Sequence, residues 1–241
     1  MQVPPLAPTV ALFLDFDGTL VDIAARPEAV RVDAALPARL AAARDRLGGA
    51  LAVVSGRPIA DIDAMLSPLR LTAAGVHGLE VRADPAAPVI VAAAATGALA
   101  AVREALAAAG LPGAGVRIED KRLALAVHYR DAPGRGEEVR ALMVAVTSAH
   151  PALHLVTGKM VVEVKPRGTD KGTALVNFLA RPPFLHRVPV MIGDDVTDED
   201  AFRAALAAGG RAIKVGPGDS LAPERLADVA AVHALVATLA G

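Results

Sequence analysis

The chain has 241 residues, a formal net charge of −1 from 25 basic and 26 acidic residues, and no cysteine. This length is enough for a core domain that carries an inserted module. The balanced charge, together with only five phenylalanines, one tyrosine and no tryptophan, argues against a general nucleic-acid binder and favours a small-molecule partner. Without cysteine, disulfides, thiolate metal sites and cysteine nucleophiles are excluded, so any metal must be held by oxygen or imidazole.

The sequence gives no indication of export or membrane insertion. The apolar start of the chain lacks a positively charged segment and is interrupted by Asp15 and Asp17, which argues against a signal peptide. The uncharged run from Ala86 to Val102 contains Pro88 and Gly97 and falls short of the ~20 strongly apolar residues that span a bilayer. We therefore expect a soluble, cytoplasmic protein with no membrane partner.

Short apolar runs without polar alternation recur along the chain, each next to helix-like segments. Such runs are typical of buried parallel strands, and the helices supply the crossovers that these strands need. The sequence therefore predicts an α/β core with a parallel, Rossmann-like sheet. The predicted strands are Val10–Leu14, Leu51–Val54, Leu71–Ala74, Val188–Ile192 and Ala212–Val215, and the predicted helices are Leu36–Leu47, Pro58–Leu66, Thr169–Ala180, Asp198–Ala208 and Ala231–Leu239.

The middle of the chain follows a different, α+β pattern. The predicted elements are a half-exposed strand at Arg122–Tyr129, a hairpin of Leu153–Thr157 and Met160–Val164 around Gly158-Lys159, and helices at Thr96–Ala109 and Gly136–His150. A two-residue connection that contains glycine is a common hairpin turn. We expect an inserted α+β module at residues 82–163, within a core formed by residues 1–81 and 164–241.

Two carboxylates follow the first predicted strand directly, in the hexapeptide Asp15-Phe16-Asp17-Gly18-Thr19-Leu20. Open α/β sheets bind their ligands at the carboxyl ends of the strands. Asp and Gly at a strand end can also form an ordinary turn. The whole hexapeptide at the end of a buried strand favours a functional site over that alternative.

A second acidic cluster, Gly193 to Asp200, follows another predicted strand. A helix N-terminus explains Glu199 and Asp200, because acidic residues are favourable in the first turn. It does not explain Asp194 and Asp195, which precede the helix and end a buried strand. Clustered negative charge there is costly without a cation, and oxygen ligands without sulfur suit Mg²⁺.

Two further features fit a phosphate. Ser55-Gly56-Arg57 follows a third strand, where a hydroxyl and the N–H groups of a helix start can bind an anion, although Ser-Gly is also an ordinary strand-to-helix turn. Lys171 opens a predicted helix. Arginine outnumbers lysine 20 to 5 in this chain, and Lys121, Lys159, Lys165 and Lys171 are four of the five lysines. A compact point charge retained where arginine is otherwise preferred favours a specific role for Lys171.

In this order, the four segments resemble the four motifs of phosphatases of the haloacid dehalogenase superfamily. The resemblance implies a Rossmann-like core with an inserted α+β cap, and a phospho-aspartate that forms on Asp15. It implies that Asp17 protonates the leaving alcohol and then activates water, while Ser55 and Lys171 hold the phosphoryl oxygens. The phosphate-binding group is then Asp15, Gly18, Thr19, Ser55, Gly56 and Lys171.

The same resemblance implies a Mg²⁺ ion as cofactor. Its ligands would be Asp15, the main-chain carbonyl of Asp17, and Asp194. Asp195 and Asp198 would complete the metal group by orienting the shell around the ion and Lys171. Because phosphoryl transfer depends on positioning and charge neutralisation, a cation next to the nucleophilic carboxylate fits this chemistry.

Three more segments, Gly75–Glu80, Glu119–Lys121 with His128–Arg130, and Gly158–Pro166, resemble the trehalose-6-phosphate phosphatases. In that family charged cap residues hold the sugar hydroxyls, as charge-assisted hydrogen bonds can. The substrate-binding residues that the resemblance implies are Arg57, His77, Glu119, Lys121, Arg130, Lys159 and Glu163. Lys165 is left as either a structural residue or a second phosphate-site group.

The substrate implied in this way is trehalose 6-phosphate, and two alternatives stay open. One is another sugar phosphatase of the same architecture, acting on sucrose phosphate, mannosyl-phosphoglycerate or a hexose phosphate. The other is a non-catalytic sugar-phosphate sensor, or a partner subunit of a synthase. The presence of Asp15, Asp17, Lys171 and Asp194 argues against the second alternative, since a pure binder needs no acid beside a nucleophile. Association with a trehalose-phosphate synthase and the oligomeric state also stay open.

Overall fold

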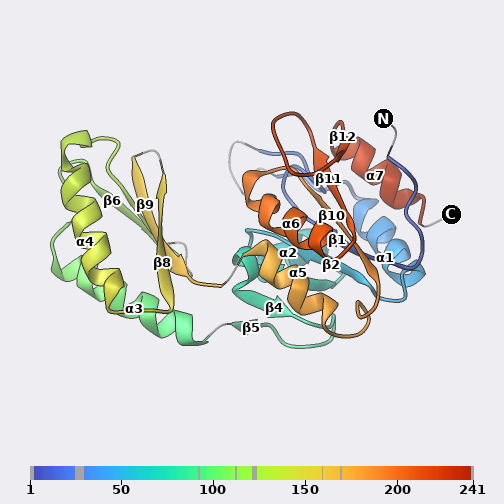
Figure 1. Ribbon diagram of the computed structural model, residues 1–241, viewed down its shortest axis with the longest axis horizontal. Helices are drawn as coiled ribbons and strands as arrows, with labels where there is room; N and C mark the ends of the chain where they lie inside the picture. Colours follow the sequence, from blue (N-terminus) through green and yellow to red (C-terminus); the bar gives the residue numbers. More distant parts are fainter. Residues whose placement is uncertain are drawn as a thin grey trace. The chain divides into compact units, whose positions relative to one another are not determined.

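The structure is a computed structural model that describes residues 3–24, 30–91, 93–111, 113–120, 124–158, 160–168 and 170–239, with the backbone alone for residues 93–96. The chain forms two compact units. The core unit comprises Met1–Val91 and Thr169–Gly241, and the inserted unit comprises Ala92–Gly168. Each unit has its own β-sheet (Figure 1).

The core unit is built on an eight-stranded sheet in the order β12-β11-β10-β1-β2-β3-β4-β5. The strands from β12 to β3 are parallel, and β4 and β5 continue the sheet in antiparallel pairing. The strands are β1 Val10–Leu14, β2 Leu51–Val54, β3 Thr72–Gly75, β4 Glu80–Arg82, β5 Ile90–Val91, β10 Val188–Gly193, β11 Arg211–Val215 and β12 Glu224–Leu226. All five strands predicted for the core are therefore present.

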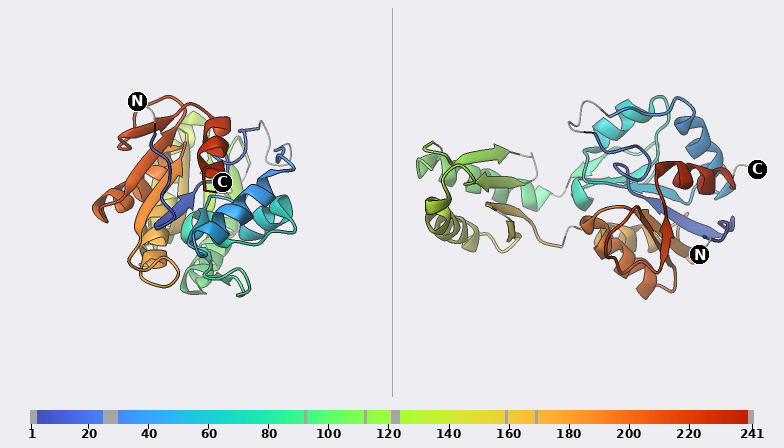
Figure 2. Two further views of the ribbon diagram at one scale, coloured as in Figure 1. Left: turned by 90° about the vertical axis from the view of Figure 1, so that its right-hand side faces the viewer. Right: turned by 90° about the horizontal axis from the view of Figure 1, so that it is seen from above.

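Helices cover both faces of the core sheet, which is the middle of three layers (Figures 1 and 2). On one face lie α5 (Lys171–Leu179) and α6 (Glu199–Ala207), and on the other α1 (Leu36–Arg46), α2 (Ile59–Leu66) and α7 (Val229–Ala237). The crossovers from β1 to β2 and from β10 to β11 run in opposite directions along the sheet. The order of the chain therefore reverses between the adjacent strands β1 and β10, which is where open α/β sheets bind ligands.

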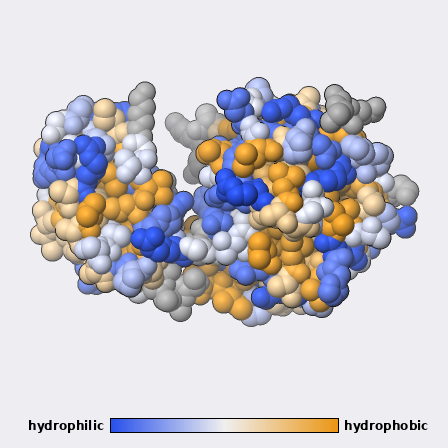
Figure 3. Space-filling model, in the orientation of Figure 1, coloured by the Kyte–Doolittle hydropathy of each residue, from blue (hydrophilic) through white to orange (hydrophobic). Residues whose placement is uncertain are grey.

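The central strands are apolar on both faces because helices cover both. Every residue of β1 and β2 is buried. The five phenylalanines of the chain all belong to this core; the ring of Phe13 in β1 lies 5.3 Å from that of Phe184 and 6.3 Å from that of Phe178 in α5. Apolar side chains also reach the surface, as the orange areas in Figure 3 show.

The two units divide at residues 91/92 and 168/169, not at the boundaries 82 and 163 expected from the sequence. β4 pairs with β3, and Arg82 at its end is fully buried in the core unit. Its guanidinium binds the Asp63 carboxylate of α2 at 2.5 and 2.6 Å, which makes this burial tolerable. At the other boundary, β9 (Val161–Pro166) extends the sheet of the inserted unit beyond residue 163.

The inserted unit has a four-stranded antiparallel sheet in the order β6-β7-β9-β8. The remaining elements of this unit are α3 Ala93–Ala108, β6 Arg117–Asp120, β7 Leu125–His128, α4 Gly136–Ser148 and β8 Leu153–Gly158. The predicted helices and hairpin are present, and β7 lies within the predicted strand Arg122–Tyr129, of which residues 122–123 lie outside the described residues. Buried residues of both helices and of the sheet form a separate hydrophobic core.

Tyr129, the single tyrosine of the chain, belongs to this second core and is 4% exposed. Its hydroxyl accepts a hydrogen bond from Arg140 of α4 at 3.1 Å. The inserted unit thus buries its own apolar side chains and does not depend on the phenylalanine cluster of the core unit. Together the two units confirm the predicted fold class, a Rossmann-like α/β core with an inserted α+β domain.

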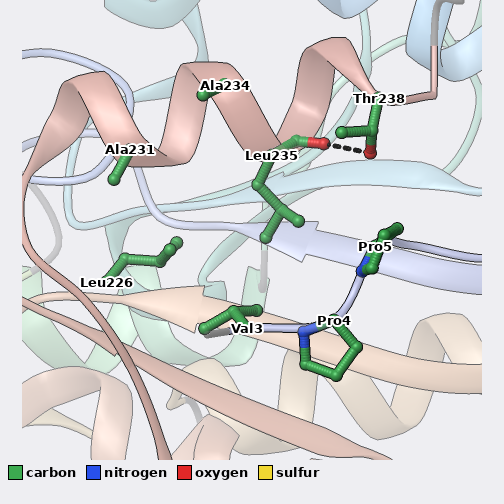
Figure 4. Close-up of a pocket in the computed structure, with 8 residues that line it drawn as sticks. All are labelled: Val3, Pro4, Pro5, Leu226, Ala231, Ala234, Leu235 and Thr238. Atoms are coloured by element: carbon green, nitrogen blue, oxygen red, sulfur yellow. Dashed lines mark hydrogen bonds between the residues drawn. The ribbon is translucent and has the colours of Figure 1, made fainter. Parts of the chain in front are cut away.

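A groove of about 630 Å³ lies in the core unit between the N-terminal segment, β12 and α7 (Figure 4). Its lining consists of Val3, Pro4, Pro5, Leu226, Ala231, Ala234, Leu235 and Thr238. None of these residues is charged, and the hydroxyl of Thr238 donates to the Leu235 carbonyl at 2.6 Å. Across the parts of the chain that the structure describes, no helix is long and apolar enough to cross a membrane.

Candidate active site

The carboxyl ends of three parallel strands bring predicted catalytic residues to one edge of the core sheet. Asp15 follows β1, Ser55 follows β2 and Asp194 follows β10. β1 and β10 are paired with Leu14 opposite Ile192, and the Asp15 N–H donates to the Ile192 carbonyl at 2.9 Å. The site therefore lies at the point where the order of the chain reverses.

Lys171 joins two of these loops through its ammonium group. Its Nζ donates to Oδ1 of Asp15 at 2.8 Å and to Oδ1 of Asp198 at 2.7 Å. Lys171 is the first residue of α5, and the helix begins there because the N-cap Asp170 accepts a hydrogen bond from the Thr173 N–H at 2.7 Å. Asp15, Lys171 and Asp198 are 4%, 2% and 0% exposed, so they form a buried charged triad.

Burial dominates the electrostatics of this cluster. It raises the pKa of the Asp15 carboxyl well above its usual value, although the charge of Lys171 opposes the shift. Burial also raises the pKa of Asp194, against a hydrogen bond with Asp15 and with the charge of Asp198 adding to the shift. Burial disfavours the charged form of Lys171. The negative charges of Asp15 and Asp198 have the larger combined effect, so the pKa of Lys171 is raised. Three acids and one lysine leave an excess of negative charge that a cation would offset.

The residues present fit a divalent cation. Carboxylate oxygens of Asp15, Asp194 and Asp198 lie within 4.8 Å of one another. Oδ1 of Asp194 is buried and accepts no hydrogen bond from the described part of the chain. Gly18, at φ +73°, lies against the same carboxylate, and a Cβ at this position would be 2.1 Å from Oδ2 of Asp194. An all-oxygen group of this kind is suited to a hard cation.

Asp198 also closes the loop that carries Asp194. Its Oδ2 accepts hydrogen bonds from the N–H groups of Asp194 and Asp195, both at 3.0 Å, so that with Lys171 both of its oxygens are bound by donors. Asp195 is exposed, and its Oδ1 accepts from the Val196 N–H at 2.7 Å. Asp194 and Asp198 thus lie in one cluster with Asp15. Asp195, which was predicted in the metal group, instead caps its own loop.

Asp17 does not belong to the cluster of three carboxylates, although it is only two residues from Asp15. Arg57 Nε donates to its Oδ2 at 2.6 Å and Arg57 Nη2 to its Oδ1 at 2.7 Å. This bidentate pair links the loop after β1 to the loop after β2. The carboxylates of Asp15 and Asp17 are therefore bound by different basic side chains. Lys171 binds Asp15, and Arg57 binds Asp17.

The predicted phosphate-binding segment after β2 is held by a strained turn. Val76 and His77 have φ values of 47° and 55°, which are unfavourable for non-glycine residues, above all for β-branched Val76. The His77 N–H donates to the Ser55 carbonyl at 2.9 Å, and a Cβ on Gly56 would lie 2.9 Å from the His77 ring. The turn thus places the imidazole against the Ser-Gly segment, where only glycine leaves it room.

The two predicted phosphate-binding residues of the first loop have different surroundings. The Thr19 hydroxyl is buried and has no hydrogen-bond partner among the described residues, and Thr19 is not among the residues that line the cavity at Asp15. The Gly18 N–H donates to the Val21 carbonyl at 2.7 Å. Gly18 therefore contributes space for Asp194 and not a free N–H group.

A cavity of about 370 Å³ opens between these loops. Its lining includes Asp15, Asp17, Ser55, His77, Lys171 and Asp194, together with Gly56, Asp195, Thr197 and the apolar Ile23. The structure of the core unit thus brings together, around one cavity, most of the residues that the sequence predicts for its chemistry.

The candidate sugar-binding residues lie in the inserted unit. Glu119 of β6 and Glu163 of β9 alternate with Ile118, Val162 and Val164, which pack against the helices, so both glutamates lie on the opposite, open face of the sheet. Ala126 of β7 pairs with both of them. The Glu119 carboxylate lies 2.8 Å from Nε2 of His128.

Other predicted residues of this group are only partly accounted for. Arg130 is exposed just after β7, and Lys165 of β9 is on the same face of the sheet as Glu163 because it is two residues further along the strand. Lys121 and Lys159 lie outside the described residues.

Lys214, the fifth lysine, was not predicted as a site residue. It is 6% exposed, and its Nζ donates to the Asp194 carbonyl and, at 2.7 Å, to the Val215 carbonyl. Lys214 thereby ties β11 to the loop that carries Asp194. The scarcity of lysine, used above for Lys171, would have identified it.

Known proteins are similar to this chain in sequence and in fold. The family model described as trehalose-phosphatase matches residues 13–224. A probable trehalose-phosphate phosphatase of Sinorhizobium fredii is 47% identical over 208 residues, which cover 86% of this chain and 78% of that protein. The structure of Aspergillus fumigatus trehalose-6-phosphate phosphatase superposes with a TM-score of 0.75 at 25% identity and covers 99% of both chains.

The fold extends to more distant proteins. A haloacid dehalogenase-like hydrolase of B. subtilis has a TM-score of 0.65 at 14% identity and covers 94% of this chain and 99% of its own, which bears on the fold alone. The fold is therefore that of the haloacid dehalogenase superfamily. With a family model that matches residues 13–224 and a relative of 47% identity, the chain belongs to the trehalose-phosphatase family.

Proposed function

We propose that the chain hydrolyses trehalose 6-phosphate to trehalose and inorganic phosphate, through a phospho-aspartate on Asp15 and with Mg²⁺ as cofactor. The observation that carries the proposal is the buried Asp15–Lys171–Asp198 triad beside Asp194 in a chain of this family. It joins a nucleophile, a cation for the phosphoryl oxygens and an oxygen-rich metal group in one cavity.

The two steps assign a role to each core residue. In the first step an Asp15 oxygen bonds to phosphorus, the bond from phosphorus to the sugar oxygen breaks, and Asp17 gives its proton to that oxygen. In the second, a water oxygen bonds to phosphorus while Asp17 takes its proton, and the bond to Asp15 breaks. Lys171 and Ser55 line the cavity and would hold the phosphoryl oxygens.

Asp15 and Asp194, with the Asp17 carbonyl, would hold the metal. When bound, Mg²⁺ supplies positive charge that reduces the repulsion between the Asp15 carboxylate and the phosphate. Asp198 is a positioning residue in this proposal, since its oxygens bind Lys171 and two backbone N–H groups.

The inserted unit would provide substrate selection. Glu119 and Glu163 on the open sheet face are suited to accept hydrogen bonds from sugar hydroxyls. Arg57 and His77 of the core unit were assigned to substrate binding with them; both line cavities at the reacting groups.

Phosphate release from a panel of sugar phosphates tests the substrate. Replacement of Glu119 or Glu163 by Gln should lower kcat/KM for trehalose 6-phosphate ~10–100-fold, since a hydrogen bond to a charged group contributes roughly 1.5–3 kcal/mol. Hydrolysis of 4-nitrophenyl phosphate, which lacks the sugar, should fall much less. Glu137→Gln on α4, whose carboxylate is exposed away from this face, is the matched control.

Two results would contradict this assignment. If another sugar phosphate were hydrolysed with a much higher kcat/KM, the substrate would be wrong. If both glutamate variants lost equal activity toward both substrates, these residues would serve the fold or the chemistry instead of recognition.

Association with a trehalose-phosphate synthase and a cytoplasmic location stay predictions. Co-purification of a synthase with the tagged chain from its own cells would test the association. Fractionation of the same cells would test the location.

A further inference from the structure

The starting observation is the separation of two carboxylates that are neighbours in sequence. Asp15 points into the cluster with Asp194 and Asp198, and Asp17 does not. β1 ends at Leu14 and the chain turns from Phe16 onward, so the two side chains need not point the same way. The Asp17 carboxylate is held instead by the bidentate contact of Arg57 with both of its oxygens, at 2.6 and 2.7 Å.

Arg57 is itself fixed by contacts on several sides. Its guanidinium lies 5.9 Å from the centre of the buried Phe16 ring, and its side chain is 12% exposed against 35% for Asp17. Its N–H donates to the Ser55 hydroxyl at 3.1 Å, and its carbonyl accepts from the Val76 N–H at 3.0 Å. A planar guanidinium held in this way imposes a direction on a carboxylate that a flexible ammonium would not.

Asp17 lies at the boundary between two cavities. Asp17, Ile23 and Gly56 line both the catalytic cavity and a second cavity of about 430 Å³. Arg57 and Pro58 line the second cavity. A phosphoryl group beside Asp15 and Lys171 therefore has Asp17 on the wall between it and the neighbouring space.

We propose that Arg57 is a positioning residue that holds the Asp17 carboxylate at the boundary of the two cavities, directed toward the leaving oxygen and away from the metal group. The proposal rests on the proposed function, in which Asp17 transfers the proton to that oxygen. In this role Arg57 acts through Asp17, and not through the direct contact with substrate predicted from the sequence.

The test compares two leaving groups that make no sugar contacts. A 4-nitrophenolate leaves readily without a proton, whereas phenolate benefits from an acid. In Arg57→Lys and Arg57→Met, kcat/KM for phenyl phosphate should fall about 30-fold or more, which is part of the ~10²–10⁴-fold that general acid catalysis contributes. For 4-nitrophenyl phosphate it should fall less than about threefold. Because kcat/KM reports the first irreversible step, slow hydrolysis of the phospho-aspartate does not mask the effect.

A matched control exists in the same unit. Arg211 binds both oxygens of Glu224, at 2.8 and 2.6 Å, between β11 and β12. Arg211→Lys removes a bidentate pair of the same kind and should leave the ratio of the two kcat/KM values unchanged. Thermal unfolding of all variants separates loss of fold from loss of chemistry.

A double-mutant cycle tests whether Arg57 acts through Asp17. In an Asp17→Asn background, Arg57→Lys should lower kcat/KM for phenyl phosphate by less than about twofold, because its target is already lost. Equal losses for both aryl phosphates in the single variants, a rise in KM with an unchanged ratio, or full additivity in the cycle would each overturn the proposal. If another sugar phosphate were hydrolysed with a higher kcat/KM than trehalose 6-phosphate, the proposed substrate would be wrong. The comparison of the two aryl phosphates would still test the role of Arg57.

Discussion

Gly18 shows how closely two loops approach at the level of single residues. Its backbone has φ +73°, and the position of a Cβ would be 2.1 Å from an Asp194 carboxylate oxygen. Any Cβ at residue 18 would therefore displace Asp194, whose Oδ1 is buried and has no hydrogen-bond partner in the described structure. The glycine is thus required twice, by the backbone conformation and by the position of the Asp194 carboxylate.

Gly18→Ala should therefore affect stability and metal binding separately. A positive φ costs a residue with a Cβ roughly 1–2 kcal/mol, and displacement of Asp194 should raise the Mg²⁺ concentration for half-maximal activity about tenfold or more. Gly209 has the same φ, +73°, with nothing near its Cβ position, so Gly209→Ala is a control for the backbone cost alone. The measurements are Mg²⁺ titrations of activity and denaturant unfolding; equal Mg²⁺ requirements in the two variants would contradict the role of Gly18.

Residue types and order were enough to predict most of the charged and polar residues that line the cavity of the core unit. Asp15, Ser55, Lys171 and Asp194 all lie around the predicted cavity. The pairing of Arg57 with Asp17 could not be predicted, because 40 residues separate them and no local pattern encodes the contact.

At the scale of elements, α5 delivers Lys171 to the site through its first turn. The helix starts at Lys171 because Asp170 accepts the Thr173 N–H, and Lys171 then reaches Asp15 and Asp198. The position of the ammonium group therefore depends on a helix cap as well as on its two carboxylate partners.

Asp170→Ala should lower both stability and activity. Loss of an N-cap costs ≈0.5–2 kcal/mol, and fraying of the first turn should release Lys171. Asp228 caps α7 by the same contact, with the Ala231 N–H at 2.8 Å, and Asp228→Ala should cost similar stability with little loss of kcat. Urea unfolding and steady-state kinetics on both variants check this; equal kcat values would contradict the link between cap and chemistry.

The central strands were predictable because helices bury them on both faces, which leaves uninterrupted apolar runs. β4 and β5 could not be predicted in this way, and the boundary expected at residue 82 falls at the end of β4. The reasons are physical. Arg82 reads as a surface residue, and its burial becomes acceptable only through Asp63 on α2. β5 has just two residues, Ile90 and Val91, both exposed, so no alternation marks it as a strand.

At the scale of the whole molecule, chemistry and the candidate sugar contacts are assigned to two units with separate cores. The charged triad and the carboxylate cluster of Asp15, Asp194 and Asp198, the proposed metal group, belong to the core unit. Ligands that bind this group should therefore stabilise the core unit directly, by mass action on the folded state.

Mg²⁺ should raise the Tm of the core unit, and more so at about pH 7.5 than at about pH 5.5. The pKa of Asp15 and that of Asp194 are raised in the fold, above the value near 4 of an unfolded chain. In the metal-free protein the folded state therefore binds these protons more tightly than the unfolded chain does. The resulting contribution to the free energy of unfolding is fully present below about pH 4 and is lost as the pH rises through the pKa values of the folded state. Protons and Mg²⁺ compete for the same oxygens, so acid reduces the effect of the ion.

Calorimetric scans with and without Mg²⁺ at several pH values measure this. Asp194→Asn, which removes one charge from the group, should give a smaller Mg²⁺ effect with a weaker dependence on pH. A Tm shift that grew as the pH fell would contradict the assignment of the carboxylates to the metal.

The distribution of aromatic residues gives each unit its own spectroscopic label. The chain has no tryptophan, its single tyrosine is Tyr129 in the core of the inserted unit, and all five phenylalanines are buried in the core unit. Tyrosine fluorescence of the unlabelled protein therefore reports on the inserted unit alone, while the near-ultraviolet circular dichroism of phenylalanine reports on the core unit. A single denaturant titration followed by both signals can distinguish joint from separate unfolding without any engineered probe.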